Sequence, residues 1–155
     1  MKTVLSALPI LVGGILIFSP APAQVLPPQE VPDAVKQGFR AKFPAVKQAE
    51  WKLKSDKNYE AEFSLKGTES AAKFDSAGKW LETESAIPAS KVPAAVRTAA
   101  DRQFRGYKVI ERQSVQRWNE KHLIYELHLE KDKEIVKVQL AADGSILSQS
   151  AKRKP

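Results

Sequence analysis

The chain has 155 residues, 25 Lys and Arg against 18 Asp and Glu, a formal net charge of +7 and no cysteine. This length suits one domain or two tightly associated halves. Without cysteine the chain can form no disulfide and has no thiol for catalysis or metal binding, so an apolar core must hold the fold together. The basic residues are dispersed along the sequence, whereas nucleic-acid-binding proteins usually concentrate them on one face or helix.

The first 23 residues have the layout of a secretory signal peptide. Lys2 precedes an apolar run over residues 4–18, and the small-residue segment Ala21–Ala23 follows it. An uncleaved membrane anchor is the alternative, but a span usually needs about 20 unbroken apolar residues. This run is shorter and contains proline and glycine. We therefore predict cleavage before Gln24 and a periplasmic or secreted protein without a membrane span.

A helix is predicted near the start of the mature chain. Residues 24–30 contain two prolines and are expected to form an extended leader. Pro32 fits the first turn of a helix, because that turn needs no hydrogen bond from its nitrogen. The apolar residues that follow recur every four positions and form one stripe, namely Val31, Val35, Phe39 and Phe43.

Strand-like segments follow this helix and are separated by short turns. The clearest is Tyr59–Leu65, where apolar and polar residues alternate as in a strand with one wet face. Short turns favour antiparallel neighbours, because a parallel crossover needs a dozen or more residues. Four strands are predicted in this part of the chain, at residues 46–54, 58–66, 69–75 and 79–85.

The second half of the chain repeats this order. Residues 92–96 match residues 31–35 at an offset of 61, and residues 125–130 nearly copy the strand at 59–64 at an offset of 66. The five extra residues fall in a hairpin around residues 116–121.

We therefore predict an α+β fold built as a tandem repeat of one helix followed by a four-stranded antiparallel sheet. The helices should pack on one face of a curved sheet. The first repeat covers residues 31–87, the second covers 88–150, and residues 151–155 are expected to be a basic tail. Each repeat has about 60 residues and is marginal alone, so the two should bury apolar surface together.

Several motifs of the first repeat resemble a known family. They are Val-Pro-x-x-Val at the helix start, Phe43-Pro44, Trp51, Tyr59-Glu60-x-x-Phe63 and Phe74-Asp75-x-x-Gly78-x-Trp80-Leu81. This order, followed by a degenerate second round, resembles the PepSY-like exported proteins described as beta-lactamase-inhibitor-like. The resemblance covers residues 31–148. It implies two helix-plus-four-strand units whose sheets form a broad curved surface opposite the helices, and in the inhibitor that names the family this surface grips an enzyme. The shared positions belong to the core and turns, so no functional residue is carried over and inhibition of a beta-lactamase does not follow from the fold.

The sequence offers little for catalysis or metal binding. Glu126, His128 and Glu130 share one strand face, but three ligands on a single strand rarely converge on a metal without help from elsewhere. No serine lies in a turn typical of a nucleophile. Glu60 and Glu62 are expected to stay hydrated on an open sheet face and so to be unsuited to acid–base work. We predict a non-enzymatic protein with no metal and no cofactor.

A binding function is therefore the main hypothesis. The face opposite the helices can bind a partner, although its charges can also serve only as cross-strand pairs that stabilise the sheet. Trp118 beside Arg117 in the inserted hairpin has the residue types enriched at binding hot spots, or it folds back over the end of the sheet. The candidate partner-binding residues are Arg117, Trp118, Glu126, His128, Glu130, Lys137, Glu60, Glu62 and Lys73.

We predict that the protein binds or inhibits another envelope or secreted protein through its open sheet face and hairpin loops. The alternative is an envelope protein that binds a small molecule or responds to an ion. A protein partner requires a flat or curved surface centred on the sheet, whereas a small ligand requires a closed concave pocket with a few convergent polar groups.

Overall fold

The computed structural model describes residues 23–154, so the predicted signal peptide lies outside them except for its last residue. The described chain folds into one antiparallel sheet of nine strands in sequence order. The strands are β1 (Gln24–Leu26), β2 (Glu50–Leu53), β3 (Tyr59–Leu65), β4 (Thr68–Phe74), β5 (Trp80–Ala86), β6 (Lys108–Arg117), β7 (Ile124–Lys131), β8 (Glu134–Leu140) and β9 (Ile146–Arg153). No helix between residues 23 and 154 is long and apolar enough to cross a membrane.

Two helices cover the sheet, and each begins directly after a proline. Helix α1 (Asp33–Lys42) lies between β1 and β2, and α2 (Ala94–Gln103) lies between β5 and β6. A single 3-10 turn precedes each helix, η1 (Pro28–Glu30) before α1 and η2 (Ala89–Lys91) before α2. The missing N–H of proline is harmless at this position, which is why the helices begin there.

The apolar side chains form two separate cores, one under each helix. In the first core, Val35 and Phe39 of α1 pack against apolar residues of β2, β3 and β4, with the Phe39 ring 5.3 Å from the Trp51 ring. In the second, Val96 and Ala100 of α2 pack against apolar residues of β7 and β8. The apolar stripe predicted from Val31 to Phe43 is confirmed, because its residues are buried in the first core or packed against it.

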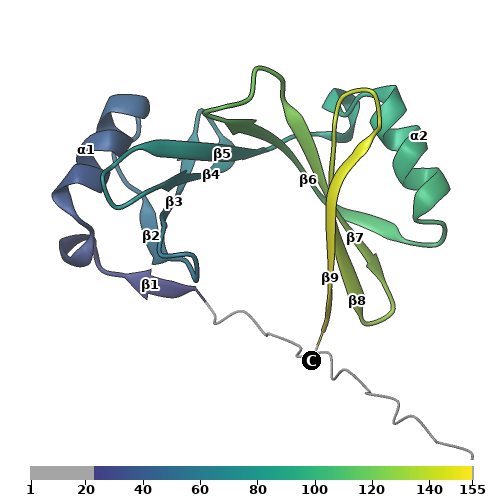
Figure 1. Cartoon of the computed structure of the whole chain (residues 1–155), viewed down its shortest axis with the longest axis horizontal. Coiled ribbons are helices and arrows are strands. Elements are labelled where there is room, and N and C mark those ends of the chain that lie inside the picture. The colour runs from purple at the N-terminus through teal and green to yellow at the C-terminus, as the bar shows by residue number, and fades with distance from the viewer. Residues whose placement is uncertain (1–22, 155) are drawn as a thin grey trace, which may run out of the picture.

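The sheet bends into an arch with the helices at its two outer sides (Figure 1). Strand residues alternate between a core on the outer side and the inner, concave face, so in β7 the side chains of Leu127 and Leu129 reach the core while those of Glu126 and His128 face inward. Irregular pairing at β4–β5, β6–β7 and β8–β9 interrupts the ladder. Such bulges increase the local twist and bend of a sheet.

The predicted α+β class with two helices is confirmed, but the strands do not form two four-stranded sheets. Residues Glu82–Ala86 of β5 pair with Gln113–Arg117 of β6, so the two halves share one sheet. We call this pairing the seam. The seam places the inner faces of both halves on one continuous surface.

Both ends of the described chain extend the sheet further than the sequence suggests. The predicted leader contributes β1, which pairs with β2 and buries Leu26 against the first core. At the other end, Ala151, Lys152 and Arg153 pair with β8, so β9 includes residues assigned to a basic tail. Charged residues can occupy an edge strand, since alternate side chains there point into solvent.

The β4–β5 hairpin touches α1 through backbone atoms. Gly78 has a φ of +82°, and a Cβ added to it would lie 2.1 Å from the carbonyl oxygen of Ala34. Gly38 faces it from the helix, where an added Cβ would lie 2.0 Å from the Gly78 oxygen. Helix and hairpin therefore pack at a distance that only glycine permits.

We expect Gly78→Ala to lower the free energy of unfolding by more than about 2 kcal/mol, because it combines a left-handed backbone with a backbone clash. Gly67→Ala is the matched control, since Gly67 also has a positive φ of +78° but nothing lies within 4 Å of an added Cβ. That control should lose only about 1 kcal/mol. Urea denaturation of both variants measures the difference, and equal losses would contradict close packing at Gly78.

Candidate partner-binding face

The concave face carries a series of ion pairs that begins in the first half of the sheet. Lys52 of β2 lies 2.6 Å from the carboxylate of Glu62 on β3. Lys54, just after β2, lies 3.0 Å from Glu60. These pairs join neighbouring strands through side chains on the inner face.

Ion pairs continue toward the seam and across it. Lys73 of β4 lies 2.9 Å from Glu82 of β5, and the Arg117 guanidinium of β6 contacts the same carboxylate at 3.0 Å. Arg117 also donates a hydrogen bond of 2.9 Å to the Gln139 side-chain oxygen on β8. Glu82 is therefore held by one cation from each half of the sheet.

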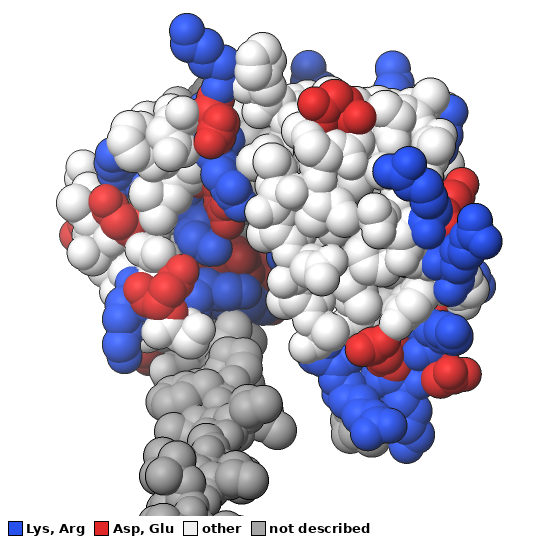
Figure 2. Space-filling model, turned by 45° about the vertical axis from the view of Figure 1, so that its right-hand side comes forward, with Lys and Arg blue, Asp and Glu red and all other residues white. Residues whose placement is uncertain are grey.

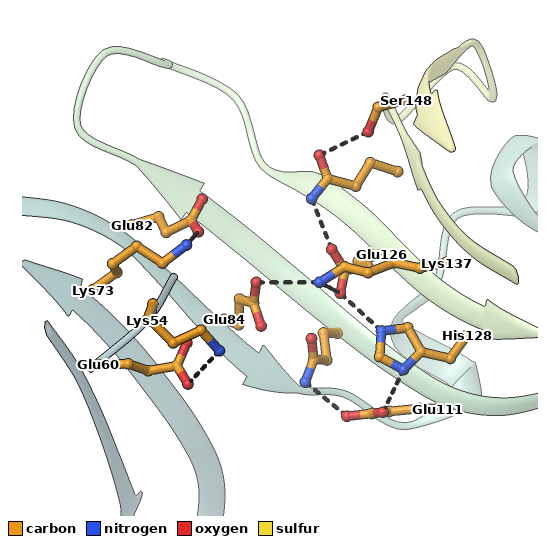
Figure 3. Close-up of polar contacts among 12 residues, drawn as sticks. Lys54, Glu60, Lys73, Glu82, Glu84, Glu111, Glu126, His128, Lys137 and Ser148 are labelled. Atoms are coloured by element: carbon orange, nitrogen blue, oxygen red, sulfur yellow. Dashed lines mark hydrogen bonds and ion pairs between the residues drawn. The ribbon is translucent and has the colours of Figure 1, made fainter. Parts of the chain in front are cut away.

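Glu126 of β7 is the centre of the network in the second half. Its side chain is fully buried and accepts hydrogen bonds from Lys137 at 2.7 Å, His128 at 3.0 Å and Gln139 at 2.7 Å. Burial alone would raise the pKa of this carboxyl group, but the bonds from His128, Lys137 and Gln139 lower the pKa to about 2. Glu126 is thus ionised throughout the physiological pH range (Figure 3).

His128 links Glu126 to a second carboxylate. Its Nδ1 atom lies 2.6 Å from Glu111 of β6, and its Nε2 atom faces Glu126. The hydrogen bond with Glu126 raises the pKa of the imidazole above 6.5, and the negative charge of Glu111 adds to this effect. Burial opposes the rise, because it disfavours the charged ring.

Glu84 of β5 approaches the same network from across the seam. Its carboxylate lies 3.7 Å from the Lys137 ammonium group. Burial raises the pKa of Glu84, and the charge of Lys137 only partly opposes that effect. The strand partner of Glu84 is Val115, which is fully buried. The nearby carboxylates Glu126 and Glu82 also raise the pKa of Glu84.

The predicted site residues mostly come together on this face, which we call the groove. Figure 3 shows labelled side chains from both halves pointing toward one another across it, and Figure 2 shows charged side chains gathered in the hollow between the two lobes. Of the nine predicted residues, seven belong to the ion pairs or hydrogen bonds of the groove: Arg117, Glu126, His128, Lys137, Glu60, Glu62 and Lys73. Glu130 instead pairs with Lys154 at the end of β7.

The expectation of an open, hydrated sheet face is wrong for its central carboxylates. Glu126 is 0% exposed and Glu60 only 9% exposed. Partners on the same face replace water around these carboxylates: Lys54 at Glu60, and His128, Lys137 and Gln139 at Glu126.

The sequence analysis missed several groove residues because their positions depend on strand register. Glu82 and Glu84 alternate with Thr83 on β5, which is a strand signal, but the irregular pairing beside Phe74 hides which residues oppose them. Five groove residues belong to this group: Lys52, Lys54, Glu82, Glu84 and Glu111.

Trp118 lies beside the groove and is not part of its ion-pair network. Its ring is 54% exposed, and the ammonium group of Lys79 lies 3.3 Å from the ring centroid. Its backbone N–H donates a hydrogen bond of 3.0 Å to the Leu81 oxygen, which holds the start of the β6–β7 loop against β5. This position agrees with both roles predicted for Trp118, an exposed anchor for a partner and a cover over the end of the sheet.

The groove can recognise charge patterns, but its arrangement is unlike a metal centre. Within residues 23–154, no group of three or more His, Asp and Glu side chains is placed to hold a metal ion. The carboxylates instead have lysine, arginine, histidine and amide partners. Such a face can form hydrogen bonds and ion pairs with another molecule.

The fold, an antiparallel sheet with two helices, is shared with several solved bacterial proteins. The structure is similar to a BLIP-like protein from Bacteroides fragilis, with a TM-score of 0.66, 22% identity and coverage of 84% of this chain and 90% of that one. A DUF2874 family protein from Bacteroides uniformis gives a TM-score of 0.68 at 19% identity, with coverage of 79% and 88%. A structure from Bacteroides eggerthii described as "putative periplasmic proteins" gives a TM-score of 0.70 at 21% identity. The match covers 78% of this chain and 88% of that one.

The sequence also matches one family model twice, over residues 21–66 and 57–147. The family is described as "Putative beta-lactamase-inhibitor-like, PepSY-like", and this chain belongs to it. The resemblance stated from the sequence motifs is confirmed. No curated protein matches the chain.

The lowered pKa of Glu126 predicts a loss of stability in acid. The pKa of Glu126 is about 2 in the folded state, whereas its ordinary value is 4.5. Between these two pH values the unfolded state therefore binds more protons than the folded state. The stabilisation is present above pH 4.5 and is lost as pH falls through about 2. As the pH falls from 4.5 to about 2, the free energy of unfolding of the wild type should decrease by on the order of 3 kcal/mol more than that of Glu126→Gln.

Denaturant unfolding at a series of pH values measures this difference. Glu69→Gln is the control, since Glu69 is an exposed glutamate of the same sheet. Parallel stability curves for the wild type and Glu126→Gln would show that Glu126 does not titrate as the network requires.

The raised pKa of His128 predicts a charged imidazole at pH 6.5. Its contribution to stability is fully present below 6.5 and is lost as pH rises through the folded pKa. An NMR titration should give a midpoint above 6.5 in the wild type and a lower one in Glu111→Gln, because this variant removes a nearby negative charge. Glu69→Gln should leave the midpoint unchanged, and an unchanged midpoint in Glu111→Gln would contradict the ion pair.

Proposed function

We propose that this chain is a non-enzymatic binding module of the cell envelope whose groove binds another envelope protein. The observation that carries the proposal is the ion-pair network that spans both halves of the arched sheet. An envelope location is supported by the similar structure described as periplasmic, and a binding role by the inhibitor-like family description.

The groove is suited to a protein partner because its charges are balanced and ordered. It has six glutamates and, opposite them, four lysines, one arginine and His128, whose pKa is raised. Side chains already fixed in ion pairs lose little further freedom on binding. Alternating charges favour a partner with a complementary pattern over a uniformly charged one.

The same features argue against catalysis. A general acid or base works best with a pKa near the operating pH. Glu126 has a pKa of about 2 and three hydrogen-bond donors, so it accepts a proton only in strong acid. We infer that the groove recognises its ligand and leaves it chemically unchanged.

A protein partner is also favoured over the small-molecule alternative. A small ligand needs a concave pocket with room for its atoms. Here Lys137 and Arg117 extend over the concave face and make ion pairs across the seam. These side chains occupy the centre of the groove and present a polar surface to a larger partner.

We further infer that the two halves of the chain are a tandem repeat. Each helix follows a proline and a single 3-10 turn, and each is followed by four antiparallel strands. Divergence then explains why the second half has the longer inner-face network while the first half has the more aromatic core.

An exchange of charges within one groove pair tests the proposed surface. In Lys52→Glu/Glu62→Lys the ion pair and the net charge are kept, but the pattern presented to a partner is reversed. The matched control is Asp33→Lys/Lys36→Asp on α1, where the exchanged groups also form a pair, at 2.9 Å. We expect the groove exchange to weaken partner binding at least tenfold, equivalent to about 1.4 kcal/mol, and the control to retain it.

The partner is first isolated by affinity capture from the periplasmic extract of the source organism, using the chain from Gln24 as bait. Affinities of all variants for the purified partner are then measured by calorimetry. A stoichiometric partner that binds the groove exchange as tightly as the wild type would disprove the groove as its site.

Trp118→Ala completes the set, because Trp118 is the exposed aromatic beside the groove. Weaker binding with unchanged thermal stability would assign it to the interface. Unchanged binding with a lower melting temperature would assign it to packing on the sheet.

A further inference from the structure

One end of the second half of the sheet is strongly basic. Here β6 begins, β7 turns into β8, and β9 ends; the register places Lys108 opposite Glu130 and Glu134 opposite Arg153. We call this region the basic end. Its cations are Arg105, Lys108, Lys131, Lys133, Lys152, Arg153 and Lys154, and its carboxylates are Glu130, Asp132 and Glu134. Seven cations and three carboxylates give +4, more than half of the net charge of +7 of the chain.

Two of the three carboxylates at the basic end are engaged by other groups. Glu130 lies 2.5 Å from the ammonium group of Lys154, and Glu134 accepts a hydrogen bond from the Tyr107 hydroxyl. All seven cations are exposed. Within the described part of the chain, six of them have no carboxylate within 4 Å, the exception being Lys154.

This distribution differs from that of the groove, where every lysine and arginine is paired. A hollow of about 610 Å³ lies at the basic end, and its charged lining residues are four cations, Lys131, Lys133, Lys152 and Arg153, and two carboxylates, Asp132 and Glu134. Figure 2 shows lysine and arginine side chains gathered at the lower end of the right-hand lobe, apart from the hollow between the lobes. The basic end is therefore a second surface with its own electrostatic character.

We propose that the basic end binds the phosphate-bearing headgroups of an anionic membrane surface. Exposed basic clusters adsorb to such surfaces, and each Lys or Arg close to the lipid raises binding by roughly fivefold. The cations lie around a hairpin turn and strand ends, so they can meet a planar surface together. A nucleic acid or another extended polyanion instead requires cations that follow a groove or stripe.

The hollow gives this contact a place for a headgroup. Lys131 ends β7 and Lys133 lies in the β7–β8 turn, while Lys152 and Arg153 are the last residues of β9. Pairing of β9 with β8 holds the two sets in register. The cations are thus presented by a folded surface, whereas the sequence alone suggests a solvated tail.

Co-sedimentation with lipid vesicles tests the proposal, using the chain from Gln24, which contains every described strand and helix. The vesicles contain either equal parts of phosphatidylglycerol and phosphatidylcholine or phosphatidylcholine alone. We expect binding only to the anionic vesicles, and loss of binding in about 0.5 M salt, where charges are strongly screened.

The decisive variant is Lys131→Gln/Lys133→Gln/Lys152→Gln, which should lower the partition coefficient on the order of 100-fold. Its matched control is Lys47→Gln/Lys66→Gln/Lys91→Gln, which removes three exposed lysines that lie outside the basic end. The control should change partitioning no more than about threefold. Circular dichroism verifies that both variants are folded.

Absence of wild-type binding to anionic vesicles would overturn the proposal. So would an equal loss in both triple variants, because binding would then depend on net charge alone. Binding to long-chain polyphosphate without binding to vesicles would assign the surface to a soluble polyanion instead. The groove exchange Lys52→Glu/Glu62→Lys should leave vesicle binding intact, so the two proposals fail independently.

Discussion

The architecture of the inner face depends on a single buried charge, the carboxylate of Glu126. An ionised group with no exposure is tolerable only when hydrogen bonds replace the water it has lost. Lys137, His128 and Gln139 supply those bonds from β7 and β8. Removing one partner from such a group typically costs about 3–5 kcal/mol, whereas exposed ion pairs contribute less than about 1 kcal/mol. The buried carboxylate therefore requires one arrangement of side chains and excludes looser ones.

That requirement extends across the seam. Lys137 neutralises Glu126 and also lies 3.7 Å from Glu84, which belongs to the first half of the sheet. Arg117 likewise connects Glu82 on β5 with Gln139 on β8. The two apolar cores are separate, so these polar contacts and the β5–β6 ladder are what hold the halves at a fixed angle. Rotation of one half would separate Glu82 from Arg117 and Glu84 from Lys137, so these contacts favour one angle between the halves and one shape of the groove.

Local sequence patterns were sufficient to predict both helices and most strands, but they did not predict β1, the end of β9 or the burial of the groove. Four-residue spacing from Val31 to Phe43 gave the first helix, and alternation from Tyr59 to Leu65 gave a strand and its two faces. The burial of Glu126 depends instead on the curvature of nine strands and on irregular pairing, which are set by contacts distant in sequence. The end of β9 was predicted as a tail for a related reason. Lys152 and Arg153 carry no local strand pattern, and their place in the sheet depends on backbone pairing with β8.

Basic residues are dispersed along the sequence, but in the folded chain many of them lie on two surfaces of different chemistry, the groove and the basic end. In the groove each cation opposes a carboxylate on a neighbouring strand, so long-range attraction is weak and recognition depends on short-range pattern. At the basic end most cations have no such carboxylate, so attraction acts over about 8–10 Å and is insensitive to the detailed shape of a partner. Alternation along the strands separates inner-face charges from the apolar cores, while hairpin turns and strand ends gather the remaining cations. A dispersed charge pattern therefore does not exclude a concentrated basic surface, because antiparallel pairing brings turns and chain ends together at one edge.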